Sequence, residues 1–478
     1  MANPFFMKVS VSFLLFAILL SVAAAAGDPD LPSAAKSGDA AAVQKLLISG
    51  ADINARDADG RTALMWAAWT GNQEIAALLI QAKADLNLQE GTEGGSALLF
   101  AATRGNTAVA RMLLQAGADF RNIGRTAVLE AAAHGYLDTV QLLLDSGADV
   151  NTSEQGLSAL MLAVRNGHES VVDLLLQRKA AVDSTDSVSQ TPLMIAAENG
   201  SLSIVKKLVQ AGANVNAQQA NGNTPLIQAS RKGRLEVVQY LIGAGASVNL
   251  TNLVSASPIL FAADEGHQAV VETLLGSGAS ANARGDKAVT PLMMAARKCH
   301  FDVAKLLLSR GADAKARSET GMTPLLFAAS CGDPATIRLL IRSGANPSAP
   351  DPNGMTPLLL AAQRGYKEAV DLLLKEKSDI SALDHENQSA LMLASFYGNL
   401  EIAQMLLTSG ADPNLQSRDG KTALMFASMT GRADLVGLLL KHNANVQMTD
   451  ANGFTALSYA REKNWKDVIG LLESAGAK

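Results

Sequence analysis

The chain has 478 residues, with 40 basic and 45 acidic side chains and a formal net charge of −5. This weakly acidic balance, without long runs of one sign, disfavours non-specific binding to nucleic acid. Apolar residues make up 48% of the chain and aromatic residues only 4%, which suits a continuous core of thin helices packed through Leu and Ala.

The N-terminal segment 1–26 has the order of a secretory signal peptide. Lys8 is the only charged side chain before Asp28, and an apolar stretch at 9–22 leads into alanines at 23–26. We expect this bacterial-looking segment to be cleaved after export, leaving the mature chain in the periplasm or secreted, without membrane contact. The alternative is an uncleaved membrane anchor, because the stretch 9–26 would barely span a bilayer.

The stretch Thr191–Asn216 predicts two short antiparallel helices followed by a loop. Thr191 can cap a helix and Pro192 suits its first turn, while Gly200 and Gly212 can each end a helix in the left-handed conformation. Two helices of about ten residues are marginal alone in water, so the unit needs neighbours.

The same unit recurs along most of the chain. Its start is a Thr or Ser followed by Pro or Ala and an aliphatic residue, at Thr62, Ser96, Thr126, Ser158, Thr191, Thr224, Ser257, Thr290, Thr323, Thr356, Ser389, Thr422 and Thr455. The differences between successive numbers are 34, 30 and 32, and then 33 nine times. A further unit at the front lacks this start but keeps Ala34, Ala35 and Gly38 in phase.

A period of about 33 residues with a T-P-L-x-x-A core resembles the ankyrin repeat family, and the resemblance covers nearly the whole mature chain. It implies an all-α solenoid of about 14 helix-turn-helix units with loop or β-turn fingers. We divide the chain into a signal peptide (1–26), an N-terminal capping repeat (27–56), the ankyrin repeat array (57–454) and a C-terminal capping repeat (455–478), and count the array as one elongated domain. Where the family has His after T-P-L, this chain has mostly Met or Leu, so we expect a more apolar helix start.

Four second-helix ends carry another residue in place of Gly, namely Lys83, Lys179, Lys377 and Asn443. If these positions are left-handed, each Lys costs about 1–2 kcal/mol, so the loop geometry there is expected to differ.

No pattern in the sequence indicates catalysis. Three of the six histidines, His168, His267 and His300, fall at the start of a second helix, where the family pattern itself prefers His, so we interpret them as structural. Metal-binding, phosphate-loop and nucleophile-elbow motifs are missing from the sequence, and we expect no catalytic residue, metal or cofactor.

The two cysteines lie in neighbouring units. Cys299 replaces a helix-stop glycine, and Cys331 is next to that position one unit later. Stacked equivalents about 8–10 Å apart exceed the range of about 4.4–6.8 Å between the Cα atoms of a disulfide, so we expect two free, mostly buried thiols. A strained bridge is the alternative, since export leads to an oxidising compartment.

The resemblance implies that the two residues before each first-helix stop face a concave groove, together with the loop tips. Charge alternates at these positions through Arg165, Glu198, Arg231, Lys232, Asp264, Glu265, Arg297 and Lys298. We interpret them as an exposed ladder of salt bridges worth about 0–1 kcal/mol per pair, with a polar docking strip as the alternative.

Apolar side chains occupy other groove and loop-tip positions, namely Trp69, Met355, Phe396, Tyr397, Met429 and Phe454. Exposed apolar patches commonly mark contact sites, so these residues are candidates for a partner hot spot. Packing between adjacent units explains them equally well.

The sequence therefore predicts an exported, non-catalytic and monomeric scaffold that binds a protein or peptide partner through its concave groove and loop tips. A membrane-tethered scaffold and a mechanical spacer are the alternatives, and an enzyme is the least favoured.

Overall fold

A computed structural model describes residues 30–91, 94–120 and 124–478. The predicted signal peptide, 1–26, lies outside them. The chain divides into two compact units, Met1–Ala180 and Ala181–Lys478, which are called unit 1 and unit 2 and are described separately. The described residues form 28 helices in consecutive pairs, which confirms the predicted all-α array.

In unit 1 the elements are α2 (Leu31–Ser37), α3 (Ala40–Ile48), α4 (Ala63–Thr70), α5 (Gln73–Gln81), α6 (Ala97–Thr103), α7 (Thr107–Gln115), α8 (Gly124–His134), α9 (Leu137–Asp145), β1 (Ser153–Glu154), β2 (Leu157–Ser158), α10 (Ala159–Arg165) and α11 (Glu169–Gln177). β1 and β2 form an antiparallel hairpin in which Ser153 pairs with Ser158 and Glu154 with Leu157.

In unit 2 the elements are α12 (Pro192–Asn199), α13 (Leu202–Gln210), α14 (Pro225–Arg231), α15 (Leu235–Gly243), α16 (Pro258–Asp264), α17 (Gln268–Gly276), the 3-10 turn η1 (Asp286–Ala288), α18 (Pro291–Arg297), α19 (Phe301–Ser309), α20 (Pro324–Cys331), α21 (Pro334–Arg342), α22 (Pro357–Arg364), α23 (Lys367–Lys375), α24 (Ala390–Tyr397), α25 (Leu400–Thr408), α26 (Ala423–Met429), α27 (Ala433–Lys441), α28 (Ala456–Glu462) and α29 (Lys466–Ser474).

Most first helices begin directly after the Thr or Ser that the sequence predicts as their cap. The Thr191 hydroxyl accepts a hydrogen bond from the Met194 backbone N–H at 3.3 Å, and Pro192 follows in the first turn. Ser257 begins a helix without this side-chain bond, and Thr126 lies inside α8, which begins at Gly124. The interval between Ser96 and Thr126 is 30 residues instead of 33, so this repeat has fewer residues for its finger loop.

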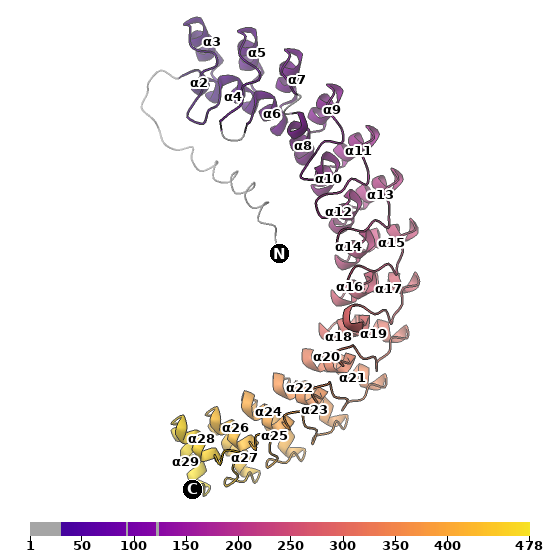
Figure 1. Ribbon diagram of the computed structural model, residues 1–478, viewed down its shortest axis with the longest axis vertical. Helices are drawn as coiled ribbons and strands as arrows, with labels where there is room; N and C mark the ends of the chain where they lie inside the picture. Colours follow the sequence, from indigo (N-terminus) through magenta and orange to yellow (C-terminus); the bar gives the residue numbers. More distant parts are fainter. Residues whose placement is uncertain (1–29, 92–93, 121–123) are drawn as a thin grey trace. The chain divides into compact units, whose positions relative to one another are not determined.

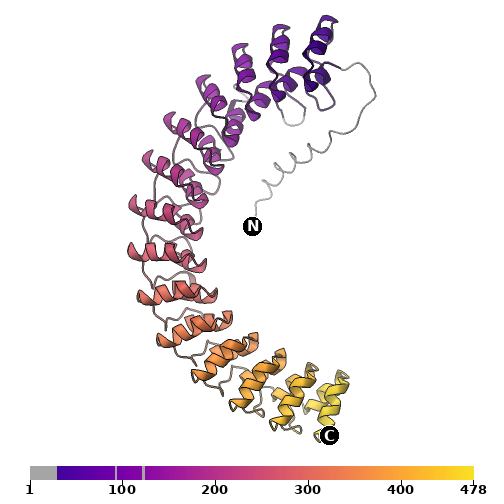
Figure 2. The same cartoon turned by 180° about the vertical axis from the view of Figure 1, so that it is seen from behind.

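Within each unit the pairs stack in two rows, one of first helices and one of second helices (Figure 1). In unit 2 the first helices run along the inner side of the curve, and the reverse view shows the same stacking (Figure 2). Small side chains such as Ala196 and Ala197 are fully buried in the first helices, which allows close approach. The Met residues after the cap are buried as well, as expected; Met194 is 0% exposed.

Polar bonds also tie each pair to the next. Asn216 donates through Nδ2 to the Gly245 carbonyl at 3.3 Å and accepts from the Ser247 N–H at 2.8 Å. Neighbouring finger loops share backbone bonds, such as Ala451 N–H to the Asp419 carbonyl at 2.9 Å. Gly354, at φ +80°, lets the next finger approach, because a Cβ there would lie 2.9 Å from the Asp384 Cα.

The non-glycine residues at the second-helix ends are all left-handed. Lys83, Lys179, Lys377 and Asn443 have φ of 65°, 63°, 60° and 65°. The expected change of loop geometry is therefore wrong, because these residues keep the glycine-like conformation and carry its strain.

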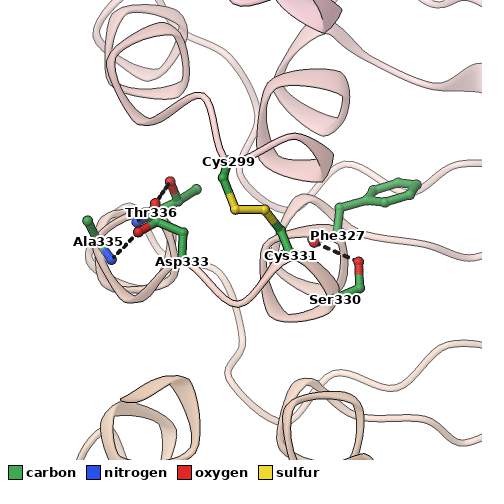
Figure 3. Close-up of a disulfide and its surroundings, with 7 residues drawn as sticks. All are labelled: Cys299, Phe327, Ser330, Cys331, Asp333, Ala335 and Thr336. Carbon is green, nitrogen blue, oxygen red and sulfur yellow. Dashed lines mark hydrogen bonds between the residues drawn. A yellow bond between two sulfur atoms is a disulfide. The ribbon is translucent and has the colours of Figure 1, made fainter. Parts of the chain in front are cut away.

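The expectation of two free thiols is also wrong, because Cys299 and Cys331 are joined in a disulfide (Figure 3). Their Cα atoms lie 6.0 Å apart, which is closer than the distance of about 8–10 Å expected between equivalent residues of stacked repeats. Cys331 is the last residue of α20, whereas Cys299 lies after the end of α18 and has φ +59°. Cys331 therefore lies one residue before the repeat position that corresponds to Cys299.

The short side chain of Asp333 in the following repeat also leaves room for the disulfide. At the corresponding Gly266, an added Cβ would lie 2.7 Å from the imidazole of His300. One repeat later Asp333 stands in place of this His, and its short side chain turns instead to the Ala335 and Thr336 N–H groups at the start of α21 (Figure 3).

Candidate partner-binding groove

A groove of about 350 Å³ lies in unit 2 between the first helices α24 and α26 and the finger loops before them. Its lining consists of Gln363, Asp384, Glu386, Gln388, Leu393, Phe396, Tyr397, Ser417, Asp419, Lys421, Phe426 and Met429. The structure thus brings together three of the predicted hot-spot residues, Phe396, Tyr397 and Met429. We name this site the C-terminal groove.

Aromatic rings form the apolar part of the C-terminal groove. Phe396 lies edge-on to Tyr397 and to Phe426, with ring centroids 5.1 and 5.8 Å apart. Phe396 and Tyr397 remain 41% and 48% exposed, although rings of this size usually bury most of their surface. The Tyr397 hydroxyl accepts a hydrogen bond from Gln363 Nε2 at 3.4 Å.

The finger loops add polar groups at the rim. Asp384 Oδ1 accepts from the backbone N–H groups of Glu386 at 2.9 Å and Gln388 at 2.7 Å, which fixes the loop as a turn. In the next finger Lys421 Nζ lies 3.3 Å from Asp419 Oδ2.

The other predicted hot-spot residues lie elsewhere. Met355 and Phe454 occupy the loop position of Gln388, one repeat before it and two repeats after it. Met355 is half-buried, while Phe454 is 44% exposed and its ring centroid lies 5.7 Å from that of Tyr459.

Trp69 belongs to a packed cluster in unit 1. Its ring lies edge-on to Phe100 at 5.6 Å, and the Arg61 and Arg104 guanidinium groups lie 5.5 and 4.6 Å from the ring centroid. Arg61 Nε also donates to Glu90 Oε2 at 2.7 Å. This geometry corresponds to the packing interpretation of Trp69.

The alternating charges form ion pairs in two groups of unit 2. Glu198 lies 3.3 Å from Arg231 and 3.5 Å from Lys232. Asp264 lies 2.6 Å from Arg297 and 3.0 Å from Lys298, and Glu265 lies 3.4 Å from Lys298. The hydrogen bond between Lys298 and Asp264 raises the pKa of the Lys298 amine. Arg165 is the last residue of α10, in unit 1. These contacts correspond to the salt-bridge interpretation, and a binding role of the strip stays a prediction.

The histidines at second-helix starts bond to the preceding repeat. His168 Nε2 lies 2.9 Å from the Ala133 carbonyl, and the rings of His267 and His300 bond the Arg231 and Asp264 carbonyls at 3.1 Å each. Their role is structural, because each ring satisfies a carbonyl at the end of a first helix. Across the described part of the chain, His, Cys, Asp and Glu side chains form no group of three or more placed to hold a metal ion. In the same part of the chain, every helix falls short of the length and apolar character that crossing a membrane requires.

Sequence reasoning missed several groove residues, above all Phe426, Asp384 and Gln388. Phe426 falls four residues after its cap, a position that is buried or half-buried in every capped repeat. Aligning the repeats in phase would have placed it next to Phe396, because stacked first helices bring residues about one period apart into contact.

These features define a class of protein, a helical repeat array with a recessed surface on its row of first helices. The family described as "Ankyrin repeats (3 copies)" matches residues 31–123, 120–186, 160–252, 259–351, 325–417 and 391–478. The chain belongs to the ankyrin repeat family. It is also similar to "Ankyrin repeat domain-containing protein 29" of Danio rerio, with 47% identity over 57 residues. That match covers 12% of this chain and 19% of the relative, so it reports the repeats alone.

Proposed function

We propose that this chain is an exported, non-catalytic scaffold that binds a protein or peptide segment in the C-terminal groove. Ankyrin repeats indicate a protein–protein interaction scaffold. The observation that carries the location is the pair Phe396 and Tyr397, two large rings that stay nearly half exposed beside a hollow of about 350 Å³. Rings of this kind are typical anchors of interfaces.

Export to the periplasm or the outside of the cell is supported by two independent features. The segment 1–26 has the order of a signal peptide. The Cys299–Cys331 disulfide is of the kind that persists in oxidising compartments. We propose that the mature chain acts there as a monomer, with neither nucleic acid nor membrane as a partner.

The binding proposal is tested by crosslinking the mature chain in its native compartment and identifying what is captured. Tyr397→Ala removes a groove ring, and Tyr240→Ala on α15 removes a comparable ring from the row of second helices. We expect the wild type and Tyr240→Ala to capture the same protein and Tyr397→Ala to lose it. Equal capture by all three chains would show that the groove is not the site.

The export proposal has a separate test. Thiols are counted under denaturing conditions in protein isolated from cells without reductant, with alkylation at lysis. We expect none to react before reduction and two to react afterwards. Two reactive thiols at the outset would place the chain in a reducing compartment and contradict export.

A further inference from the structure

Unit 1 contains a cradle for a cation that the chain fills with its own side chain. The Arg61 guanidinium lies 5.1, 5.5 and 5.0 Å from the ring centroids of Trp66, Trp69 and Phe100. Glu90, only 6% exposed, completes the cradle by accepting from Arg61 Nε. A guanidinium is held well there, because it can stack on aromatic faces while it bonds a carboxylate.

The C-terminal groove repeats the aromatic part of this cradle. Phe396 and Phe426 occupy the repeat positions of Trp69 and Phe100, and the geometry of the two pairs agrees, with centroid distances of 5.8 and 5.6 Å and interplanar angles of 84° and 80°. Arg61 directly precedes its cap Thr62, and the residue directly before Ser389 is Gln388. The groove therefore has the rings without the internal guanidinium.

A carboxylate in the groove also differs from its equivalent in unit 1. Asp57 Oδ2 accepts from the indole N–H of Trp66 at 2.7 Å. Asp384 occupies the repeat position of Asp57, but the residue in place of Trp66 is Leu393, which has no donor. Asp384 thus holds its loop through Oδ1 and keeps Oδ2 available for a donor from a ligand.

The net charge of the groove lining is negative, which favours a cationic side chain. The groove has three acidic side chains, Asp384, Glu386 and Asp419, and one basic side chain, Lys421, so its formal charge is 1 − 3 = −2. Arg418 Nη1 lies 3.7 Å from Glu386, but both side chains are mostly exposed, at 70% and 60%, so this pair offsets little.

We propose that the C-terminal groove receives an arginine side chain from a partner protein, set against Phe396 and Phe426 as Arg61 is set against Trp69 and Phe100 in unit 1, with a neighbouring apolar side chain of the partner on Tyr397 and Met429. The guanidinium lies against Phe396 and Phe426 and donates to Asp384 Oδ2. This inference rests on the proposed function and specifies the partner as a basic segment with an adjacent apolar residue.

The test uses a random peptide library displayed on phage and selected against the full mature chain. Enriched peptides are then synthesised, and their Kd values are measured by fluorescence polarisation. Gln388→Arg supplies an internal guanidinium at the position of Arg61 and should fill the cradle. Asp384→Asn keeps the oxygen that holds the loop but removes the charge.

Matched controls exist in unit 2 itself. Gln190→Arg makes the same change directly before Thr191, and Asp351→Asn alters an aspartate whose Oδ1 makes the same turn bonds, to the N–H groups of Asn353 and Met355. Tyr397→Ala reports whether a peptide uses the groove. Thermal unfolding confirms that each variant folds, and Asp384→Asn tests the inference independently if Gln388→Arg does not fold.

We expect enriched peptides to carry Arg beside an apolar residue and to bind about tenfold more weakly to Gln388→Arg and to Asp384→Asn, as for loss of a charge-assisted hydrogen bond. The two controls should leave Kd unchanged. Peptides that depend on Tyr397 but lack Arg, or that bind Gln388→Arg and Asp384→Asn as tightly as the wild type, would overturn the arginine inference and leave the proposed groove standing. Peptides indifferent to Tyr397→Ala, or no enrichment, would overturn both.

Discussion

The aromatic cluster of unit 1 and the C-terminal groove of unit 2 start from the same repeat positions and end as different environments. Trp69 and Phe396 both lie seven residues after their caps, and each meets an aromatic ring of the next first helix edge-on. In unit 1 Arg61 and Glu90 close the cluster, whereas Gln388 leaves the groove open. The residue before the cap, Arg61 or Gln388, thus distinguishes a ring packed under a guanidinium group from a ring that stays at the surface.

The largest effect is expected from opening the closed cluster. Arg61→Gln leaves the buried carboxylate of Glu90 without its ion pair, and we expect a loss of about 4 kcal/mol in the free energy of unfolding, as for breaking one side of a buried pair. Urea unfolding followed by circular dichroism measures this loss. Arg418→Gln breaks an exposed pair and should cost under about 1 kcal/mol. Similar losses for the two variants would mean that unit 1 is not closed by Arg61.

Truncating the two equivalent rings should separate stability from binding. Trp69→Ala is expected to cost about 3 kcal/mol, because the ring packs against Phe100 and two guanidinium groups. Phe396→Ala should cost about 2 kcal/mol less, since 41% of the side chain is already exposed. Phe396→Ala should reduce partner capture more than Trp69→Ala does. Equal unfolding losses, measured in the same urea series, would contradict the distinction.

The left-handed lysines offer a change that should act alike in both units. The strain of about 1–2 kcal/mol exceeds the extra chain entropy of glycine, about 0.5–1 kcal/mol, so Lys83→Gly and Lys377→Gly should each gain about 0.5 kcal/mol. Lys463→Gly is the control, because Lys463 has φ −93° and should lose stability on the same change. The midpoints of urea unfolding measure all three. A loss at both left-handed positions would show that the lysine side chains contribute more than the strain costs.

A pH-dependent effect distinguishes the loop bond of Tyr459, in the last complete finger, from that of Trp66, in the first. Burial, and then the hydrogen bond to Asp450, raise the pKa of Tyr459 from 10.0 to about 12. A raised pKa means that the folded chain holds this proton more tightly, so its stabilising effect is complete below pH 10 and is lost as the pH rises towards 12. Trp66 makes the equivalent bond to Asp57 and does not titrate in this range. The stability of Tyr459→Phe should therefore fall less steeply over this interval than that of the wild type, and parallel pH profiles would contradict the assignment.

Much of the fold could be predicted because its signals are local. A cap such as Thr191, a proline in the first turn and a glycine at the stop each act within a few residues, and their repetition fixes the phase of every pair. Three of the groove residues, Phe396, Tyr397 and Met429, followed from the same phase. Asp384, Gln388 and Phe426 did not, because their importance depends on side chains contributed by neighbouring repeats.

The sequence by itself thus determined the repeat, its period and the apolar faces, since these depend on helix periodicity and on short-range backbone preferences. The tertiary structure decided that Cys299 and Cys331 pair, because a left-handed residue and a helix end one position out of phase bring their Cα atoms to 6.0 Å. It also decided that Trp69 packs half-buried under two guanidinium groups while Phe396 stays 41% exposed. Each of these outcomes depends on residues roughly one repeat apart, whose distance and direction are set only when the repeats stack.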